Sequence, residues 1–369
     1  PFRLQRLMCI RVRANPVWVD KTGNGHDLQM KNFSWKGMSG VGGYVENYNR
    51  WTKSAVRADI TFTDHSFNVT SVKINQAQFY YQSSGGEQPF TVPSGTVIVK
   101  GLTDGQVLEY IYTDIEGRHV FTVKNDGIYT LPSFEFIVKG AYYGFQFNKV
   151  QESCNITIEQ LPLYPGALVF DGVDDYGVCD NFPILTKEKG YTVVALRQWI
   201  SMGEGLYGLV SNVKNWFNDG AFVLEYNSNN ATNKFVNRPV SFGNVNIEMD
   251  LPNNFTYQTS KSYKGVPITT GSFKGTNSLF VGKLNNIIGN CSNVAIWELV
   301  FLDHDATEEE LTKIKDYFVK TYPWLFPDQA WTVVGKTNED EVGATIANIT
   351  GNGKDLVLAN FGFADGSGD

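Results

Sequence analysis

The chain has 369 residues, of which 42% are hydrophobic and 14% aromatic, enough apolar material for packed cores in two or three domains. Its formal net charge is −7 and it has no basic block, which argues against nucleic acids and anionic membranes as partners. No apolar run approaches the ~20 residues that span a bilayer, so no membrane insertion is expected.

The composition favours β structure. The chain contains 36 glycines, 18 tyrosines and 25 phenylalanines, a mixture typical of short strands joined by tight turns. The four cysteines are far apart and form no CxxC pair, so metal binding by them is not expected, and their redox state is open. These cysteines are Cys9, Cys154, Cys179 and Cys291.

A segment near the N-terminus is repeated near the C-terminus. Residues 22–40 read TGNGHDLQMKNFSWKGMSG and residues 350–368 read TGNGKDLVLANFGFADGSG, with ten of the nineteen positions identical. The Asn-Gly pair favours positive φ, and Leu28 and Met30 then alternate with their neighbours. The motif therefore predicts a turn that leads into a strand with one buried face.

The two copies lie 328 residues apart, a period far too long for a solenoid, so the repeat has the size of a domain. Residues 324–369 are interpreted as the start of a second repeat copy, and the chain as a slice of a longer array. The alternative is that both copies pair as strands within one domain. Val357, Phe361 and Phe363 have no local core, which predicts that this segment packs on another chain, a neighbouring segment or the N-terminal region.

Two segments resemble the laminin-G-like members of the concanavalin A-like lectin-glucanase superfamily. Residues 167–178, ALVFDGVDDYGV, resemble the FDGVDDYV signature that opens many of these domains. Residues 289–319 resemble the closing strand and short helix of the family. A capping box of Thr307 with Glu310 independently predicts a helix at about 307–320. The resemblance implies an all-β fold with a jelly-roll sandwich.

In the family the GNG motif precedes FDG by a few tens of residues, whereas ~120 residues intervene here. The resemblance thus implies a discontinuous sandwich of residues 10–50 plus 164–323, with a second β-sandwich, residues 55–163, inserted into it. In the insertion, alternation predicts strands that include Val72–Tyr81 and Phe134–Tyr142. The repeat arrangement resembles that of Bacteroidetes phage-encoded or surface proteins.

No catalytic motif is present in the sequence. The four histidines form no HExxH pattern, no GxSxG elbow occurs, and the ExDxE strand of related glycan hydrolases is missing. Period-two alternation places Glu225 and Glu298 among apolar neighbours. These acids are therefore expected at salt-bridged rim positions or as isolated acids, not as a catalytic pair, and the chain is predicted not to be an enzyme.

A glycan site is predicted in a loop between two expected strands, Phe222–Tyr226 being the second. The loop joins an aromatic platform to amide and carboxylate groups, although Trp216 capping the core is the alternative. Its candidate residues are Asn215, Trp216, Asn218 and Asp219. The family resemblance also implies Ca²⁺ at the sandwich rim, with Asp174, Asp175 or Asp219 as candidate ligands; no other cofactor is expected.

Two functions remain open from the sequence. The first is a non-catalytic glycan-binding or adhesion module of a phage tail or fibre, or of a secreted surface protein. The second is a purely structural component of a virion or surface array without ligand binding. The expected partners are surface glycans or other virion and surface proteins, in a homo-oligomer or repeat array. Both functions predict a location in the virion, in the extracellular space or at the cell surface.

Overall fold

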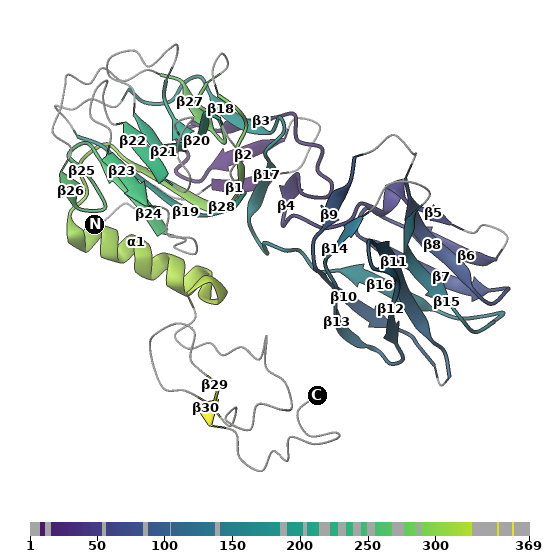
Figure 1. Ribbon diagram of the computed structural model, residues 1–369. Coiled ribbons are helices and arrows are strands. Elements are labelled where there is room, and N and C mark those ends of the chain that lie inside the picture. The colour runs from purple at the N-terminus through teal and green to yellow at the C-terminus, as the bar shows by residue number, and fades with distance from the viewer. Residues whose placement is uncertain are drawn as a thin grey trace. The chain divides into compact units, whose positions relative to one another are not determined.

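The computed structural model describes residues 8–11, 16–53, 57–83, 88–103, 105–136, 141–184, 190–201, 205–213, 222–227, 234–238, 245–248, 255–267, 277–285, 289–326, 345–346 and 356–357. Residue contacts divide the chain into two units, residues 1–305 and 306–369. Strands joined by antiparallel pairing dominate the first unit (Figure 1), so the prediction of an all-β fold is confirmed.

Two large sheets of the first unit contain the N-terminal strands and most strands after residue 164. The nine-stranded sheet has the order β1 (Met8–Arg11), β2 (Val17–Asp20), β3 (Leu28–Lys31), β18 (Tyr176–Cys179), β27 (Leu279–Val281), β20 (Tyr207–Ser211), β21 (Val223–Asn227), β22 (Lys234–Arg238) and β23 (Val245–Glu248). The seven-stranded sheet has the order β26 (Val266–Pro267), β25 (Ser262–Tyr263), β24 (Phe255–Thr259), β19 (Thr192–Ser201), β28 (Asn293–Leu302), β17 (Leu168–Asp171) and β4 (Gly40–Val41).

These two sheets share one hydrophobic core. Leu28 and Leu209 from the first sheet and Val193 and Val294 from the second belong to the same cluster of buried side chains, each with no exposed area. Burying one such side chain is worth roughly 1.5–3 kcal/mol. Two sheets that close on a common core form a β-sandwich, and this one is called the main sandwich below.

The repeated GNG segment pairs as the sequence predicts. β3 is hydrogen-bonded to β18, with Met30 opposite Gly177, and β4 is hydrogen-bonded to β17, with Gly40 opposite Val169. Leu28 in β3 is fully buried, as the alternation predicts. Segments from before and after the insertion therefore form neighbouring strands of the same sheets, and residues 28–31 pair with none of the strands between 55 and 163.

The intervening residues form a second β-sandwich, called the inserted domain. One sheet has the order β13 (Gly127–Leu131), β10 (Gly95–Lys100), β16 (Ile156–Gln160), β7 (Ser66–Val72) and β6 (Ala58–Phe62). The other has the order β12 (Gly117–Val123), β11 (Leu108–Asp114), β15 (Tyr142–Phe147), β8 (Ala77–Gln82) and β5 (Thr52–Lys53). A 3₁₀ turn, η1 (Tyr48–Arg50), precedes them, and β9 (Phe90–Val92) pairs with β14 (Phe134–Phe136).

Aromatic side chains fill the core of the inserted domain. Phe67 lies with its ring centroid 4.8 Å from that of Phe79 and 5.2 Å from that of Phe145. The indole of Trp51 meets the ring of Tyr143 edge to face at 5.6 Å. Such packing adds to the area that each ring buries and holds the aromatic residues described below in fixed orientations.

The chain enters and leaves the inserted domain at adjacent points. Leu163 N donates to Gly43 O and Tyr164 N donates to Gly42 O, both at 2.8 Å. Gly42 has a φ of +85°, and a Cβ there would lie 2.7 Å from Pro162 Cβ. A side chain at this position is therefore excluded both by backbone conformation and by space.

Two predicted strands of the inserted domain are interrupted. The run Val72–Tyr81 was predicted as one strand, but β7 ends at Val72 and β8 begins at Ala77, with Gln76 at a φ of +63° and Ile74 50% exposed. The apolar positions change phase at this turn, from Val72 and Ile74 to Ala77 and Phe79, which marks the boundary between the two strands. Similarly, β14 ends at Phe136 and β15 begins at Tyr142, so the predicted strand Phe134–Tyr142 is two strands.

The second unit begins with the helix that the sequence predicts. Helix α1 (Glu308–Thr321) has the capping box of Thr307 with Glu310, and Ile314 and Phe318 are buried. A 3₁₀ turn, η2 (Pro323–Leu325), follows, and β29 (Thr345–Ile346) pairs with β30 (Leu356–Val357). The rest of residues 327–369 lies outside the described residues, so the prediction of a second repeat copy stays a prediction.

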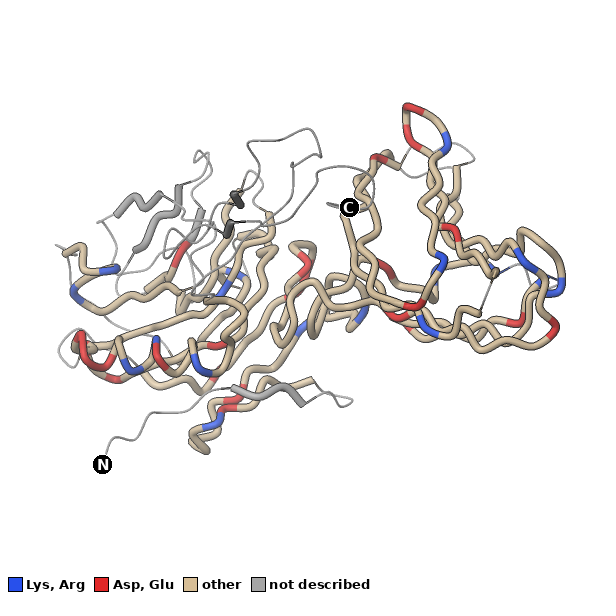
Figure 2. Tube along the Cα trace, turned by 90° about the horizontal axis from the view of Figure 1, so that it is seen from below, with Lys and Arg blue, Asp and Glu red and all other residues tan. Residues whose placement is uncertain are grey.

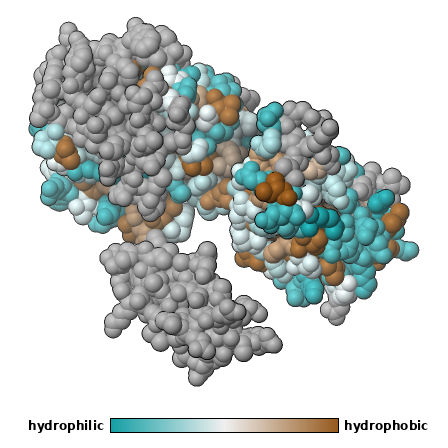
Figure 3. Space-filling view, viewed as in Figure 1, coloured by the Kyte–Doolittle hydropathy of each residue, from teal (hydrophilic) through white to brown (hydrophobic). Residues whose placement is uncertain are grey.

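Charges of both signs are dispersed along the described chain, with no continuous stripe of Lys and Arg (Figure 2). Hydrophobic and hydrophilic patches alternate on the face of the inserted domain seen in Figure 3, and Ile115 and Ile128 are 81% and 67% exposed. Among the described residues, no helix is long and apolar enough to cross a membrane.

Candidate functional site

The strongest candidate site is a pocket of about 380 Å³ that the sequence analysis did not identify. It is called the Glu46 pocket, after the carboxylate that lines it. Ser34 and Lys36–Met38 contribute to one wall. The other lining residues belong to the inserted domain and the segment that leads into it: Val45, Glu46, Asn47, Arg50, Trp51, Tyr81, Phe90–Pro93 and Tyr143.

The backbone around Glu46 is fixed by its neighbours. The Glu46 N–H donates to Gln160 Oε1 at 2.9 Å, and Gln160 Nε2 donates back to the Glu46 carbonyl at 3.1 Å. One residue later, the Asn47 side chain accepts from Asn49 N at 3.1 Å and caps η1. This turn places Arg50 and Trp51 on the pocket wall, so the sequence from Glu46 to Trp51 delivers four lining residues from one short segment.

Two neutral donors hold the Glu46 carboxylate. The Tyr143 hydroxyl lies 2.9 Å from Oε1 and 3.1 Å from Oε2, and Trp51 Nε1 donates to Oε2 at 3.2 Å. Burial raises the pKa of Glu46 to about 7, while these hydrogen bonds and the charge of Arg50 lower it only in part. The carboxyl group therefore changes its charge near neutral pH.

Aromatic side chains and a guanidinium complete the pocket. Arg50 Nη2 donates to the Tyr81 hydroxyl at 3.1 Å, and the guanidinium lies 5.2 Å from the centroid of the Tyr81 ring. Phe90 is 37% exposed, and its ring centroid lies 5.3 Å from that of Phe136. The pocket thus offers an exposed ring, an acceptor and a donor within one concave surface.

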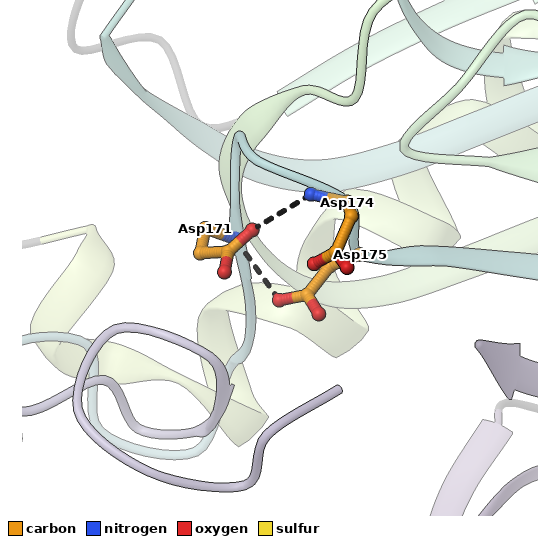
Figure 4. A group of neighbouring side chains, drawn as sticks. All are labelled: Asp171, Asp174 and Asp175. Carbon is orange, nitrogen blue, oxygen red and sulfur yellow. Dashed lines mark hydrogen bonds between the residues drawn. The ribbon is translucent and has the colours of Figure 1, made fainter. Parts of the chain in front are cut away.

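The second candidate is the acidic turn between β17 and β18, shown in Figure 4. Asp171 Oδ1 accepts from Val173 N at 2.8 Å and from Asp174 N at 3.4 Å, while Asp175 Oδ2 accepts from Asp171 N at 3.1 Å. One carboxylate oxygen from each of the three acids lies within 4.8 Å of the others. The structure therefore brings together two of the three predicted metal ligands, Asp174 and Asp175, and adds Asp171, while Asp219 lies outside the described residues.

Asp175 is the unusual member of this turn. It has no exposed area, and burial raises its pKa to about 7, with the nearby Ser39 hydroxyl lowering the value in part. Its Oδ1 is buried without a partner of hydrogen-bond geometry. Hard divalent cations such as Ca²⁺ take 6–8 oxygen ligands, so three carboxylates, backbone carbonyls and water together fit such an ion.

The predicted glycan loop lies outside the described residues, since Asn215, Trp216, Asn218 and Asp219 all fall between residues 213 and 222. Its flanks are described. Asn212 Oδ1 accepts from Phe222 N at 2.7 Å, and Asn212 N donates to Phe222 O at 3.2 Å. The two ends of the segment are therefore held together, and its role stays a prediction.

Glu225 lies in the core of the main sandwich and not at its rim. It is 1% exposed and accepts from Arg197 Nε at 2.9 Å and Nη2 at 2.7 Å. The Trp199 indole, the Thr256 hydroxyl and the Tyr263 hydroxyl donate to it at 3.1, 2.6 and 2.9 Å. Burial alone would raise its pKa, but Arg197 and these donors outweigh burial and lower the pKa to about 2.

A backbone irregularity explains why alternation misplaced this acid. The pairing of β21 with β22 shifts register between Val223 and Tyr226, and Glu225 has a φ of +49°. A bulge re-aims one side chain of a strand, and here it turns the carboxylate toward Arg197. The second acid, Glu298, is also 1% exposed, with Oε1 3.7 Å from Lys21 Nζ. Both acids therefore have the expected salt bridge, but the expected rim position is wrong for both.

No family model and no curated protein matches the chain. Among solved structures, a Trypanosoma rangeli sialidase in complex with sialic acid is similar over 72% of this chain and 62% of its own, at 8% identity and a TM-score of 0.31. The chain thus spans less than two thirds of that sialidase. The CBM22-1–CBM22-2 tandem domain of Paenibacillus barcinonensis Xyn10C is similar over 74% of this chain and 100% of the tandem, at 11% identity and a TM-score of 0.19. TM-scores this low do not indicate a shared fold or function.

Proposed function

We propose that the chain is a non-catalytic glycan-binding or adhesion module and that the Glu46 pocket is its binding site. The observation that supports this most is the combination of an exposed Phe90 ring, the fixed Glu46 carboxylate and the Arg50 guanidinium in one pocket of about 380 Å³. Sugar rings present C–H faces that pack on aromatic rings, and hydroxyl groups that need both acceptors and donors. The pocket supplies each of these.

We further propose a concanavalin A-like, laminin-G-like jelly roll for residues 10–50 plus 164–323, with residues 55–163 as the inserted β-sandwich and 324–369 as the start of a second copy. The pairing of β3 with β18 and of β4 with β17 supports the discontinuous sandwich. Such a module would serve in a phage tail or fibre, or in a secreted surface protein, with surface glycans as its partners.

The proposal excludes catalysis because glycoside hydrolysis by the usual route needs two carboxyl groups, one of them with a raised pKa. Glu46 has the raised pKa, but it is the sole carboxylate among the residues that line its pocket, all of them described. Glu225 stays ionised because of Arg197 and lies in the core, where no substrate reaches it.

We also propose that the acidic turn binds a divalent cation, with Ca²⁺ as the best fit to an all-oxygen site. The unpartnered Asp175 Oδ1 and the short distances among the three carboxylates support this. A bound cation would compensate like charges that otherwise repel each other, and would stiffen the turn between β17 and β18.

A glycan array probed with the labelled full chain tests the main proposal. We expect the wild-type chain to bind a subset of glycans, and Glu46→Gln and Phe90→Ala to bind the same glycans at least about tenfold more weakly. Glu152→Gln is the matched control, because Glu152 is an exposed acid outside the pocket. If the wild-type chain binds no glycan, the purely structural alternative holds. If both pocket variants bind like wild type, the site lies elsewhere.

A further inference from the structure

Building on the proposed glycan-binding function, we propose that the Glu46 pocket selects an uncharged pyranose unit. Hydroxyl groups of the sugar donate to the Glu46 carboxylate, and one face of its ring packs on Phe90. An acidic sugar, with a carboxylate or sulfate group, is the competing ligand class. Three features of the pocket favour the uncharged unit.

The first feature is the remaining acceptor capacity of Glu46. An ionised carboxylate accepts hydrogen bonds only, at about four lone-pair positions. Tyr143 has one hydroxyl proton, which it shares between Oε1 at 2.9 Å and Oε2 at 3.1 Å, and Trp51 Nε1 donates to Oε2, so two donor protons leave lone-pair positions of the carboxylate for a ligand. A ligand hydroxyl can therefore donate to the carboxylate, whereas the carboxylate or sulfate group of an acidic sugar has no proton to donate and is repelled by the negative charge.

The second feature is that the cations of the pocket already have protein partners. Arg50 donates to the Tyr81 hydroxyl and lies over the Tyr81 ring. Lys36 Nζ lies 3.7 Å from Asp64 Oδ1. An anion is bound most strongly by a cation whose charge is not already compensated, so the contacts of Arg50 with Tyr81 and of Lys36 with Asp64, together with the nearby Glu46 carboxylate, favour a ligand without charge.

The third feature is that the aromatic side chains of the pocket differ in exposure and in what they contact. Trp51 and Tyr143 are 6% and 3% exposed and hold the carboxylate by their polar atoms. Phe90, in contrast, presents its ring to solvent, and Phe136 and Tyr81 support that ring at centroid distances of 5.3 and 6.4 Å. One open ring in a pocket of about 380 Å³ suits a small ligand and not a long chain held along a groove.

The protonation of Glu46 gives this inference a distinctive pH dependence. The groups that face its carboxyl are Arg50, Tyr143 and Trp51, and Tyr48 and Tyr110 lie close enough to be affected by its charge. Burial raises the pKa of Glu46 to about 7, and only the ionised form accepts at both oxygens. Binding of an uncharged sugar should thus weaken about 100-fold between pH 8 and pH 5. Binding of an acidic sugar should strengthen on acidification.

The experiment titrates the full chain by calorimetry at pH 8, 7, 6 and 5 with two panels of oligosaccharides. The uncharged panel contains galactose, mannose, xylose and N-acetylglucosamine oligomers, and the acidic panel contains glucuronic, galacturonic and sialic acid oligomers. We expect binding from the uncharged panel, with affinity that falls as the pH falls. Glu46→Gln should weaken this binding at least tenfold at pH 8 and abolish its pH dependence, while Glu152→Gln should reproduce the wild-type profile. Thermal unfolding of each variant confirms that it folds.

The outcomes separate the two proposals. Acidic sugars that bind through the pocket, lose affinity in Phe90→Ala and bind more tightly at pH 5 overturn the inference and leave the glycan-binding function standing. Uncharged sugars whose affinity is unchanged by Glu46→Gln also overturn it. Absence of binding to both panels overturns the proposed function and the inference together.

Discussion

The inserted domain and the main sandwich each contain a carboxylate largely removed from solvent, and the two surroundings shift its pKa in opposite directions. Glu46 meets two neutral donors, Tyr143 and Trp51, and burial raises its pKa to about 7. Glu225 meets the Arg197 guanidinium through two hydrogen bonds, and its pKa falls to about 2. Neutral donors do not replace the water that a carboxylate loses, whereas an adjacent buried cation does. The first acid is therefore suited to binding, and the second holds the two sheets together.

The largest effect is expected when the positive charge beside Glu225 is removed. Arg197→Met leaves the Glu225 carboxylate buried without its cation, and should lower the free energy of unfolding by about 3–5 kcal/mol. Urea denaturation followed by tryptophan fluorescence measures this. The double variant Arg197→Met/Glu225→Leu, which removes both charges, should recover most of the loss. A single variant as stable as wild type would contradict the structural role given to this ion pair.

The two acids should also give opposite dependences of stability on pH. The raised pKa of Glu46 means that the folded state is favoured by its protonated form, and that this advantage is lost between pH ~4.3 and about 7. Part of the Glu46 side chain stays accessible to water. The expected loss in free energy of unfolding is therefore about 2 kcal/mol, less than the full pKa shift would give. The lowered pKa of Glu225 means that its contribution is present above pH ~4.3 and lost as the pH falls toward 2.

Unfolding free energies of wild type, Glu46→Gln and Glu225→Gln from pH 3 to 8 test both slopes. Relative to wild type, Glu46→Gln should be more stable at pH 8 and similar at pH 4. Glu225→Gln should be least stable, relative to wild type, near neutral pH. If the two acids changed the free energy of unfolding with pH in the same direction, the opposite pKa shifts assigned to them would be refuted.

A third acid, Asp175, shares the raised pKa of Glu46 but has an unpartnered oxygen, so it sharpens the comparison. We expect 5 mM Ca²⁺ at pH 8 to raise the free energy of unfolding by about 1–2 kcal/mol, as for a site of near-millimolar affinity. Asp175→Asn should remove the effect and Asp180→Asn, an exposed acid beyond the turn, should keep it. The effect should shrink at pH 6, because a protonated carboxyl group is a poor ligand. Identical melting with Ca²⁺ and with EDTA would dismiss the cation site.

The smallest effect concerns the aromatic side of the Glu46 pocket. Phe90→Ala should weaken glycan binding about tenfold, or about 1.4 kcal/mol, because the sugar loses its stacking surface. It should change the unfolding free energy by about 1 kcal/mol or less, since Phe90 is 37% exposed. Ile128→Ala, which removes an exposed apolar side chain on β13, is the control and should bind normally. Equal affinities for the two variants would show that Phe90 is not a contact.

Local signals in the sequence predict local structure well. Thr307 and Glu310 define the start of α1 because a capping box lies within four residues. The alternation of Leu28 and Met30 predicts the buried face of β3, and the resemblance around FDG predicts which strands it joins. The sequence does contain a signal for the turn at Gln76, because the apolar residues shift there from even positions, Val72 and Ile74, to odd positions, Ala77 and Phe79, and a single strand is incompatible with that shift.

The residues that line the Glu46 pocket were harder to predict, because the pocket is assembled from distant segments. Glu46, Tyr81, Phe90 and Tyr143 come from a connecting turn and three different strands, and only folding brings them together. One signal was available: the segment YVENYNRW at residues 44–51 mixes aromatic, amide and charged residues as densely as the predicted loop at 215–219. The position of Glu225 could not be read from alternation, because a bulge reverses the face of a single residue.

The hydrogen bonds between Gly42–Gly43 and Leu163–Tyr164 give the molecule a cassette architecture. The chain leaves the main sandwich and returns to it at adjacent residues. A linker that replaced the inserted domain would therefore need to span only the distance of a tight turn. Deleting residues 44–162 and joining the ends by two or three glycines should therefore leave the β4–β17 and β3–β18 pairings intact. A different domain inserted at this point would leave the strand pairing of the main sandwich unchanged.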